Sequence, residues 1–129
     1  MRFLIPMILS QILNATPLII AIERVESGGD PLAQNHSSHA VGPLQITPPV
    51  IADVNNAFHL KLRLEDMTDK RLSRVVFLRY MSMYAIAGRV GRPVTDRDRA
   101  LIWRHGPQGW RRKTSAYWEK VQNIMTLTQ

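Results

Sequence analysis

The apolar residues of this chain recur every three or four positions in five segments, a spacing that puts them on one face of a helix. The pattern predicts helices over residues 16–27, 47–58, 69–87, 95–103 and 114–125. No series of segments shows the strict alternation of apolar and polar residues that marks half-buried strands. We therefore expect a mainly α fold with at most a minimal β element, for which a short strand at Gln45 is the candidate.

Capping and turn residues mark the ends of these segments. Thr47 precedes two prolines, so its hydroxyl stands at the N-cap and a proline opens the first turn. Thr95 and Asp98 have the spacing of a capping box, with Asp in place of the usual Glu. Between the first two helices, residues 30–46 are rich in Pro, Asn, Ser, His and Gly, so we expect a loop.

The third predicted helix is the longest, with Thr68 or Asp69 as its cap and Gly88 at its end. Its apolar stripe is expected to face the core and consists of Leu72, Val75, Val76, Tyr80, Met83, Tyr84 and Ala87. We expect Arg71, Arg74 and Arg79 on this helix to project outward into solvent.

Residues 1–15 form a hydrophobic segment that we separate from a single domain over residues 16–129. Prolines and polar residues interrupt this segment, so it has no run of about 18–20 apolar residues that could span a bilayer. Arg2 and Ala15 fit a signal peptide, whereas Pro6 breaks its apolar core. Two interpretations stay open, an export signal or, as we favour, an additional helix packed on the core.

Composition sets limits on the chemistry. The 129 residues suit one domain with a core of its own. The chain has no cysteine, which excludes disulfides, metal sites with cysteine ligands and a thiol nucleophile. His36 and His39 are three residues apart, but they lie in a loop without a third ligand. We therefore expect neither a metal nor another cofactor.

Basic residues are concentrated in the second half of the chain. The sequence has 17 Lys and Arg against 10 Asp and Glu, which gives a formal net charge of +7. Residues 1–60 carry −2 and residues 61–129 carry +9. Such a balance points to an anionic partner, which leaves nucleic acid, a membrane surface or an acidic polymer.

Glu26 is the leading candidate for acid–base chemistry. It lies in the last turn of an apolar helix, just before the Gly28–Gly29 stop. Partial desolvation there, together with the negative end of the helix dipole, is expected to raise the pKa of this carboxyl group. A raised pKa is what a general acid needs near neutral pH. Taken alone, a Glu at a helix end more commonly just faces solvent.

The neighbouring motifs change this assessment. Residues 26–31 read Glu-Ser-Gly-Gly-Asp-Pro, and residues 39–45 read His-Ala-Val-Gly-Pro-Leu-Gln. Two weaker motifs follow in order, Trp-Arg-His-Gly-Pro at 103–107 and Thr-Ser-Ala-Tyr at 114–117. Over about residues 18–121 the chain resembles the catalytic domain of soluble lytic transglycosylases and the related goose-type lysozymes.

This resemblance implies a lysozyme-like fold that cleaves the MurNAc–GlcNAc β-1,4 bond of peptidoglycan. Glu26 would be the single catalytic acid and base, and the MurNAc 6-hydroxyl would close a 1,6-anhydro ring without a second carboxylate. Ser27 and Gln45 would orient the sugar or support the carboxylate. Tyr117 would correspond to the family tyrosine beside the glutamate, and Trp103 would contact substrate.

The chain departs from the family pattern at three positions. Arg104 replaces an expected Asn, and His105 stands where a small residue is common. Pro43 replaces a loop residue that is usually Leu. The first two changes put the contacts with the saccharide or its peptide in doubt, and none of the three alters Glu26 or Gln45.

Other acidic and aromatic residues have weaker claims. Glu23 lies one turn before Glu26 and could form a carboxylate pair with it, but we expect it at the surface. Asp30 or Asp53 could position water in a hydrolase, although Asp53 lies inside a helix and could form only local bonds. Trp103, Trp110, Tyr117 and Trp118 either stack on sugar rings or belong to the core.

The rival functions are a hydrolysing muramidase, a non-catalytic saccharide-binding module and a nucleic-acid-binding module. Arg104, Arg111, Arg112 and Lys113 lie among tryptophans, as in a nucleic-acid-binding patch, but the spacing of a helix-turn-helix is absent. We therefore expect peptidoglycan glycan strands as the partner, and neither nucleic acid nor a transmembrane segment. The expected state is a monomer in the cell envelope, the periplasm or the secreted fraction.

Overall fold

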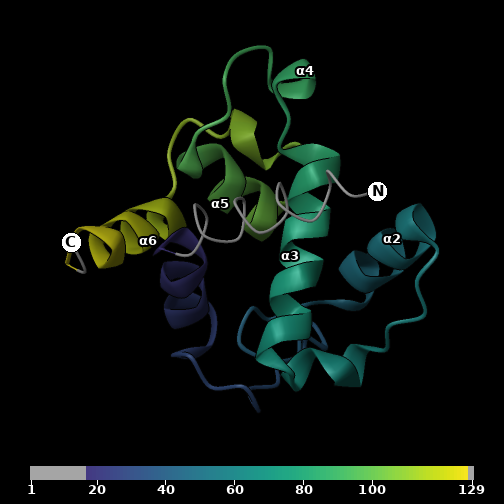
Figure 1. Cartoon of the computed structure of the whole chain (residues 1–129). Coiled ribbons are helices and arrows are strands. Elements are labelled where there is room, and N and C mark those ends of the chain that lie inside the picture. Colours follow the sequence, from purple (N-terminus) through teal and green to yellow (C-terminus); the bar gives the residue numbers. More distant parts are fainter. Residues whose placement is uncertain (1–16, 128–129) are drawn as a thin grey trace.

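The chain folds into a mainly α structure, as predicted (Figure 1). The structure is a computed structural model, and it describes residues 17–127. A first helix over residues 17–27 leads into a long loop. The helices that follow are α2 (Pro48–Phe58), η1 (Leu64–Thr68), α3 (Lys70–Tyr84), α4 (Ala87–Val90), α5 (Asp96–His105), η2 (Gly109–Arg111) and α6 (Ala116–Leu127).

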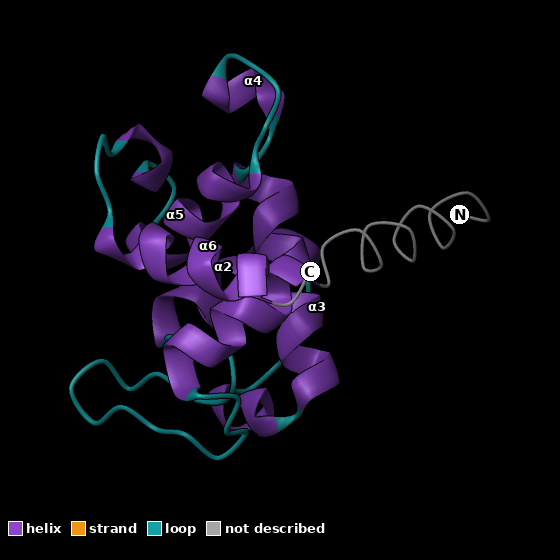
Figure 2. Ribbon diagram, turned by 90° about the vertical axis from the view of Figure 1, so that its left-hand side faces the viewer, coloured by secondary structure: helices purple, strands orange, loops and turns teal. Residues whose placement is uncertain are grey.

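The predicted hydrophobic segment over residues 1–15 lies outside the described residues. Within residues 17–127, no helix is both long and apolar enough to cross a membrane. No strand is drawn in the described part of the chain (Figure 2). Its β structure is limited to two isolated bridges, Gln34 with Val41 and Val41 with Ile46. The short strand considered at Gln45 does not form, because Gln45 has a left-handed backbone with φ 53°.

The core gathers around α3, which lies between α2 on one side and the first helix, α5 and α6 on the other (Figure 1). Phe77 is fully buried, and its ring meets Trp103 edge-on with 4.9 Å between the ring centroids. The first helix contributes its predicted stripe, with Leu18 and Ile22 fully or almost fully buried. Removal of this apolar surface from water is the main stabilising contribution.

Helix starts agree with the capping signals. The Thr95 hydroxyl accepts a hydrogen bond from the Asp98 amide, and the Asp98 carboxylate accepts one from the Thr95 amide, which completes the predicted capping box. Asp69 caps α3 by accepting bonds from Arg71 N and Leu72 N. At α2 the prolines follow Thr47 as predicted, but the Thr47 side chain makes no capping bond.

The end of the third helix was predicted too late. α3 ends at Tyr84, and Gly88 lies inside the separate short helix α4. The predicted stripe was also partly wrong, since Val75 is 38% exposed while Phe77 and Met81 are buried. Apolar residues of α3 occur on more than one of its faces, so the periodicity of the sequence did not identify which face is buried.

Glu23 was expected at the surface, and this expectation was wrong. Its carboxylate is buried and accepts two hydrogen bonds from Arg74, with Nη2 to Oε1 at 2.8 Å and Nε to Oε2 at 3.1 Å. Arg74 therefore does not project freely outward as predicted. The pairing joins the first helix to α3, because a buried carboxylate requires a compensating charge.

Replacing Arg74→Met should destabilise the fold by roughly 2–3 kcal/mol, because Glu23 would remain buried without its partner. The value lies below the usual cost of breaking a buried pair, since Arg74 is itself about a quarter exposed. Arg71→Met, on the exposed face of the same helix, is the matched control and should change stability little. Urea denaturation followed by circular dichroism measures both; equal stabilities would contradict the structural role of the pair.

Gly42 explains why the second motif needs a glycine. Its φ is 87°, and a Cβ at this position would overlap the backbone carbonyl of Met67. Gly91 has a similar φ of 83° but open space around it. Substitutions at these two glycines therefore distinguish the cost of backbone strain from the cost of steric overlap.

Gly42→Ala should lower the free energy of unfolding by about 3 kcal/mol, because strain at positive φ and overlap with backbone add together. Gly91→Ala should cost only about 1 kcal/mol, from strain alone. Thermal and urea unfolding of the two variants provide the comparison. Similar losses in both would show that the loop moves away from Met67 at little cost.

Candidate functional site

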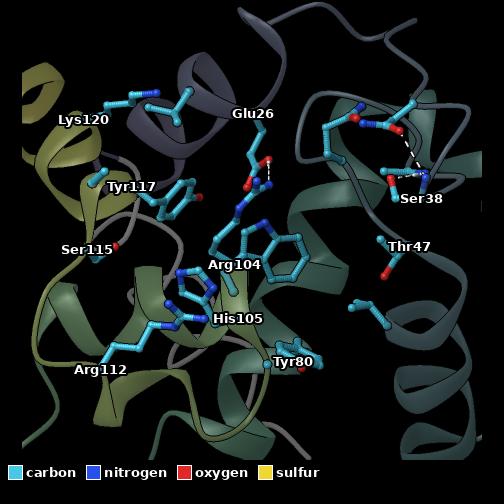
Figure 3. A pocket seen from close by; sticks show the side chains of 18 of the residues that line it. Glu26, Ser38, Thr47, Tyr80, Arg104, His105, Arg112, Ser115, Tyr117 and Lys120 are labelled. Carbon is cyan, nitrogen blue, oxygen red and sulfur yellow. Dashed lines mark hydrogen bonds and ion pairs between the residues drawn. The ribbon is translucent and has the colours of Figure 1, made fainter.

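A cleft of about 1190 Å³ opens beside the C-terminal end of the first helix (Figure 3). One wall comes from the loop and the start of α2, including Asn35, Ser38 and Thr47. The opposite wall comes from the end of α5 and the start of α6, including Arg104 and Tyr117. Segments far apart in the sequence thus meet around one cavity.

Glu26 lies in this cleft, and its side chain is only 7% exposed. Burial raises the pKa of the Glu26 carboxyl, while the positive charge of Arg104 and the nearby Tyr117 hydroxyl partly oppose this effect. The predicted direction of the shift is therefore confirmed, and desolvation is its main cause. Such a carboxyl group can hold a proton closer to neutral pH than an ordinary glutamate can.

Arg104 contacts this carboxylate through a single hydrogen bond, from Nη1 to Oε1 at 3.2 Å. The guanidinium also lies over the Tyr117 ring, 5.6 Å from its centroid. Sequence reasoning identified Arg104 as a departure from the family pattern but did not predict this ion pair. The two residues are 78 positions apart, so no local signal could have revealed it.

Tyr117 lies beside Glu26, as the resemblance implied, with its hydroxyl directed toward the carboxylate (Figure 3). The hydroxyl oxygen is buried and has no hydrogen-bond partner among the described residues. Burial and the Glu26 charge raise the pKa of the Tyr117 phenol, so this group stays protonated. It remains a donor that a ligand or a shifted Glu26 could use.

Ser27 and Gln45 hold the loop in place. Ser27 is absent from the cleft lining. Its Oγ lies 2.8 Å from the Pro43 carbonyl and 3.0 Å from the Glu23 carbonyl, and its hydroxyl hydrogen can be donated to either of them. Gln45 lines the cleft, and its Nε2 donates to the Gly42 and Ala33 carbonyls. Of the two roles considered, these bonds favour support of the site over direct contact with sugar for Ser27.

Trp103 also serves the core. It is 8% exposed, its Nε1 donates to the Leu44 carbonyl at 3.1 Å, and it packs edge-on against Phe77 and Tyr80. The same residue contributes to the lining of the cleft. Trp103 therefore fixes the loop relative to α5 and presents at most a small surface to a ligand.

The remaining candidates lie elsewhere or act differently. Asp30 is exposed and caps a turn by accepting from Leu32 N. Asp53 accepts a hydrogen bond from the Tyr84 hydroxyl on α3, so the expectation of only local bonds was wrong. Glu119, which sequence reasoning did not consider, is exposed on α6 and lines the cleft. Among residues 17–127 no group of three or more His, Asp or Glu residues could hold a metal ion.

No protein-family model matches this chain, and no curated protein matches it either.

Because its pKa is raised, Glu26 should make the free energy of unfolding depend on pH. A carboxyl group whose pKa is higher in the folded state binds its proton more tightly there, so stability falls as pH rises through the folded pKa. Glu26→Gln removes this dependence. The difference in unfolding free energy, variant minus wild type, should therefore increase from about pH 4 to about pH 8.

Urea denaturation over this pH range measures the difference. Asp30→Asn, which removes an exposed carboxylate of the adjacent loop, is the control for loss of one negative charge. A difference that is constant or decreases with pH would contradict desolvation as the dominant effect on Glu26.

Proposed function

We propose that the protein is a lysozyme-like lytic transglycosylase that cleaves the MurNAc–GlcNAc β-1,4 bond of peptidoglycan. The observation that carries the proposal is Glu26, a buried carboxyl group with a raised pKa in a large cleft. Its position in the Glu-Ser motif, with the Gly-x-x-Gln loop forming the adjacent wall, supports the same function. The expected setting is the cell envelope, the periplasm or the secreted fraction.

In the proposed reaction, protonated Glu26 donates its proton to the glycosidic oxygen as the bond to the MurNAc anomeric carbon breaks. The resulting carboxylate then takes the proton of the MurNAc 6-hydroxyl. The 6-oxygen bonds to the anomeric carbon and closes the 1,6-anhydro ring. Glu26 ends protonated, ready for the next cycle, and water is not consumed.

The carboxylates of the cleft favour this scheme over one with two catalytic carboxylates. Glycosidases of the common type place two such groups on either side of the scissile bond. Here Glu26 is the buried one, whereas Glu119 is exposed beside Lys120 at the start of α6. An internal hydroxyl nucleophile requires no second catalytic carboxylate, which agrees with this arrangement.

The walls of the cleft also suit a sugar chain. Hydroxyl and amide side chains of Asn35, Ser38 and Thr47 lie on the loop side, where they can exchange hydrogen bonds with saccharide hydroxyls. Tyr117 supplies an aromatic surface on the other side. A cleft of about 1190 Å³ has room for more than one sugar ring.

Glu26→Gln should reduce cleavage of purified peptidoglycan by at least about 10³-fold, because the amide cannot donate the required proton. Glu119→Gln is the matched control and should retain cleavage.

Wild-type activity should fall as pH rises through the raised pKa of Glu26, since the acid must be protonated. Turbidity loss of cell-wall suspensions and thermal unfolding of both variants provide the measurements.

Mass spectrometry of the digest separates the enzymatic alternatives. A 1,6-anhydro end has one water less than the reducing end that a hydrolysing muramidase would leave. Reducing ends would replace the proposal with hydrolysis, and substantial cleavage by a folded Glu26→Gln variant would remove Glu26 from the mechanism. Binding of glycan without cleavage by the wild type would indicate a non-catalytic saccharide-binding module.

A further inference from the structure

The cleft carries more positive charge than its carboxylates balance. Arg104, Arg112 and Lys120 line it, together with Glu26 and Glu119. Arg104 has one ion-pair contact, with Glu26. The Arg112 guanidinium is exposed and has no side-chain partner within the described part of the chain.

Arg104 and Arg112 act on the same neighbour. His105 lies between them, and Figure 3 shows the Arg112 side chain extended toward its ring. Burial lowers the pKa of His105, and the charges of Arg112 and Arg104 lower it further. The Tyr117 ring lies edge-on to the His105 ring, with 6.4 Å between the ring centroids, and it adds no charge. Both guanidinium groups line the same cleft, where a bound anion would offset their like charges.

We propose that Arg104 and Arg112 bind a carboxylate group of the substrate beside Glu26, and that Arg104 leaves Glu26 when it does so. The inference rests on the proposed function and specifies its substrate class. The preferred substrates are glycan strands whose peptide side chains keep free carboxylates. Strands whose peptide carboxylates are all amidated lack the group that this subsite binds.

The contact between Arg104 and Glu26 is suited to exchange. It is a single hydrogen bond of 3.2 Å, and the Arg104 side chain is 52% exposed. By contrast, the pair of Arg74 with Glu23 has two bonds and is more deeply buried. A guanidinium group can bind a carboxylate through two parallel hydrogen bonds, so a substrate carboxylate offers Arg104 a better partner than Glu26 does.

The exchange has a consequence for the acid. While Arg104 is paired with Glu26, its charge lowers the pKa of that carboxyl and thereby favours the form that cannot donate a proton. When Arg104 turns to the substrate carboxylate, its positive charge is neutralised and the protonated form of Glu26 becomes more stable. Arg104 is therefore a positioning and specificity residue whose release by an anionic substrate further favours the protonated form of Glu26.

The binding test uses N-acetylmuramyl-L-alanyl-D-glutamate and its diamide, which contain no glycosidic bond to cleave. Isothermal titration calorimetry should show that the wild type binds the free acid more tightly than the diamide. Arg112→Gln should weaken binding of the acid about tenfold, equivalent to ~1.4 kcal/mol, and leave the diamide unaffected. Arg111→Gln removes the same charge next to it, outside the cleft lining, and should bind both ligands as the wild type does.

Glu26→Gln should bind the free acid more tightly than the wild type, because Arg104 no longer has to leave a carboxylate. A proton NMR titration of His105 provides a second readout, with its signal identified by loss in His105→Gln. The His105 pKa should rise when the acid binds and should not change with the diamide. In ligand-free Arg112→Gln it should already be higher than in the wild type.

Equal affinities for acid and diamide would overturn the subsite, even if cleavage and its dependence on Glu26 persist. Inorganic phosphate that binds as tightly as the free acid would reduce the site to one for adventitious anions only. Displacement of the peptide by generic DNA, with steep salt dependence, would overturn it in favour of a nucleic-acid surface. Failure of the proposed function itself is seen separately, as cleavage that survives Glu26→Gln.

Discussion

The structure depends on the burial of two carboxylates within one turn of the first helix. Glu23 and Glu26 are three residues apart, and both side chains are withdrawn from water. The negative charge of Glu23 is compensated by two hydrogen bonds from Arg74, and this ion pair joins the first helix to α3. Glu26 receives one longer bond from a half-exposed arginine, and burial remains the dominant influence on its pKa. Desolvation of a carboxylate thus has two outcomes in this helix. At Glu23 it is offset by a structural ion pair, and at Glu26 it leaves a carboxyl group with a raised pKa.

The loop that forms the wall opposite Arg104 is held by side chains of the first helix, of α5 and of the loop itself. Ser27, Gln45 and Trp103 all bond to carbonyl groups of this loop, and each has little or no remaining capacity to donate to a ligand. Gly42 allows the loop to approach Met67 closely. The residues that the motifs associate with substrate are therefore largely occupied in shaping the cleft, while other side chains on both walls, such as Ser38 and Arg104, line it.

Much of the helical framework could be predicted because its signals are local. The Thr95–Asp98 capping box, the prolines after Thr47 and the apolar stripe of the first helix each act within a few residues, and the structure confirms them. Prediction was only partly correct for α3, where apolar residues occur on more than one face. There the neighbouring helices decide which face is buried, so Phe77 packs against Trp103 while Val75 remains partly exposed.

From the sequence, capping and periodicity predicted the starts of α2, α3 and α5, the place of Glu26 in the last turn of the first helix and the direction of its pKa shift. These features follow from spacing, capping and desolvation at a helix end. The charge partners depend on tertiary packing, since Arg74 pairs with Glu23 from 51 residues away and Arg104 pairs with Glu26 from 78 residues away. Periodicity carries no information about such pairs, because they exist only when α3 and α5 pack against the first helix and bring distant charges into one low-dielectric space.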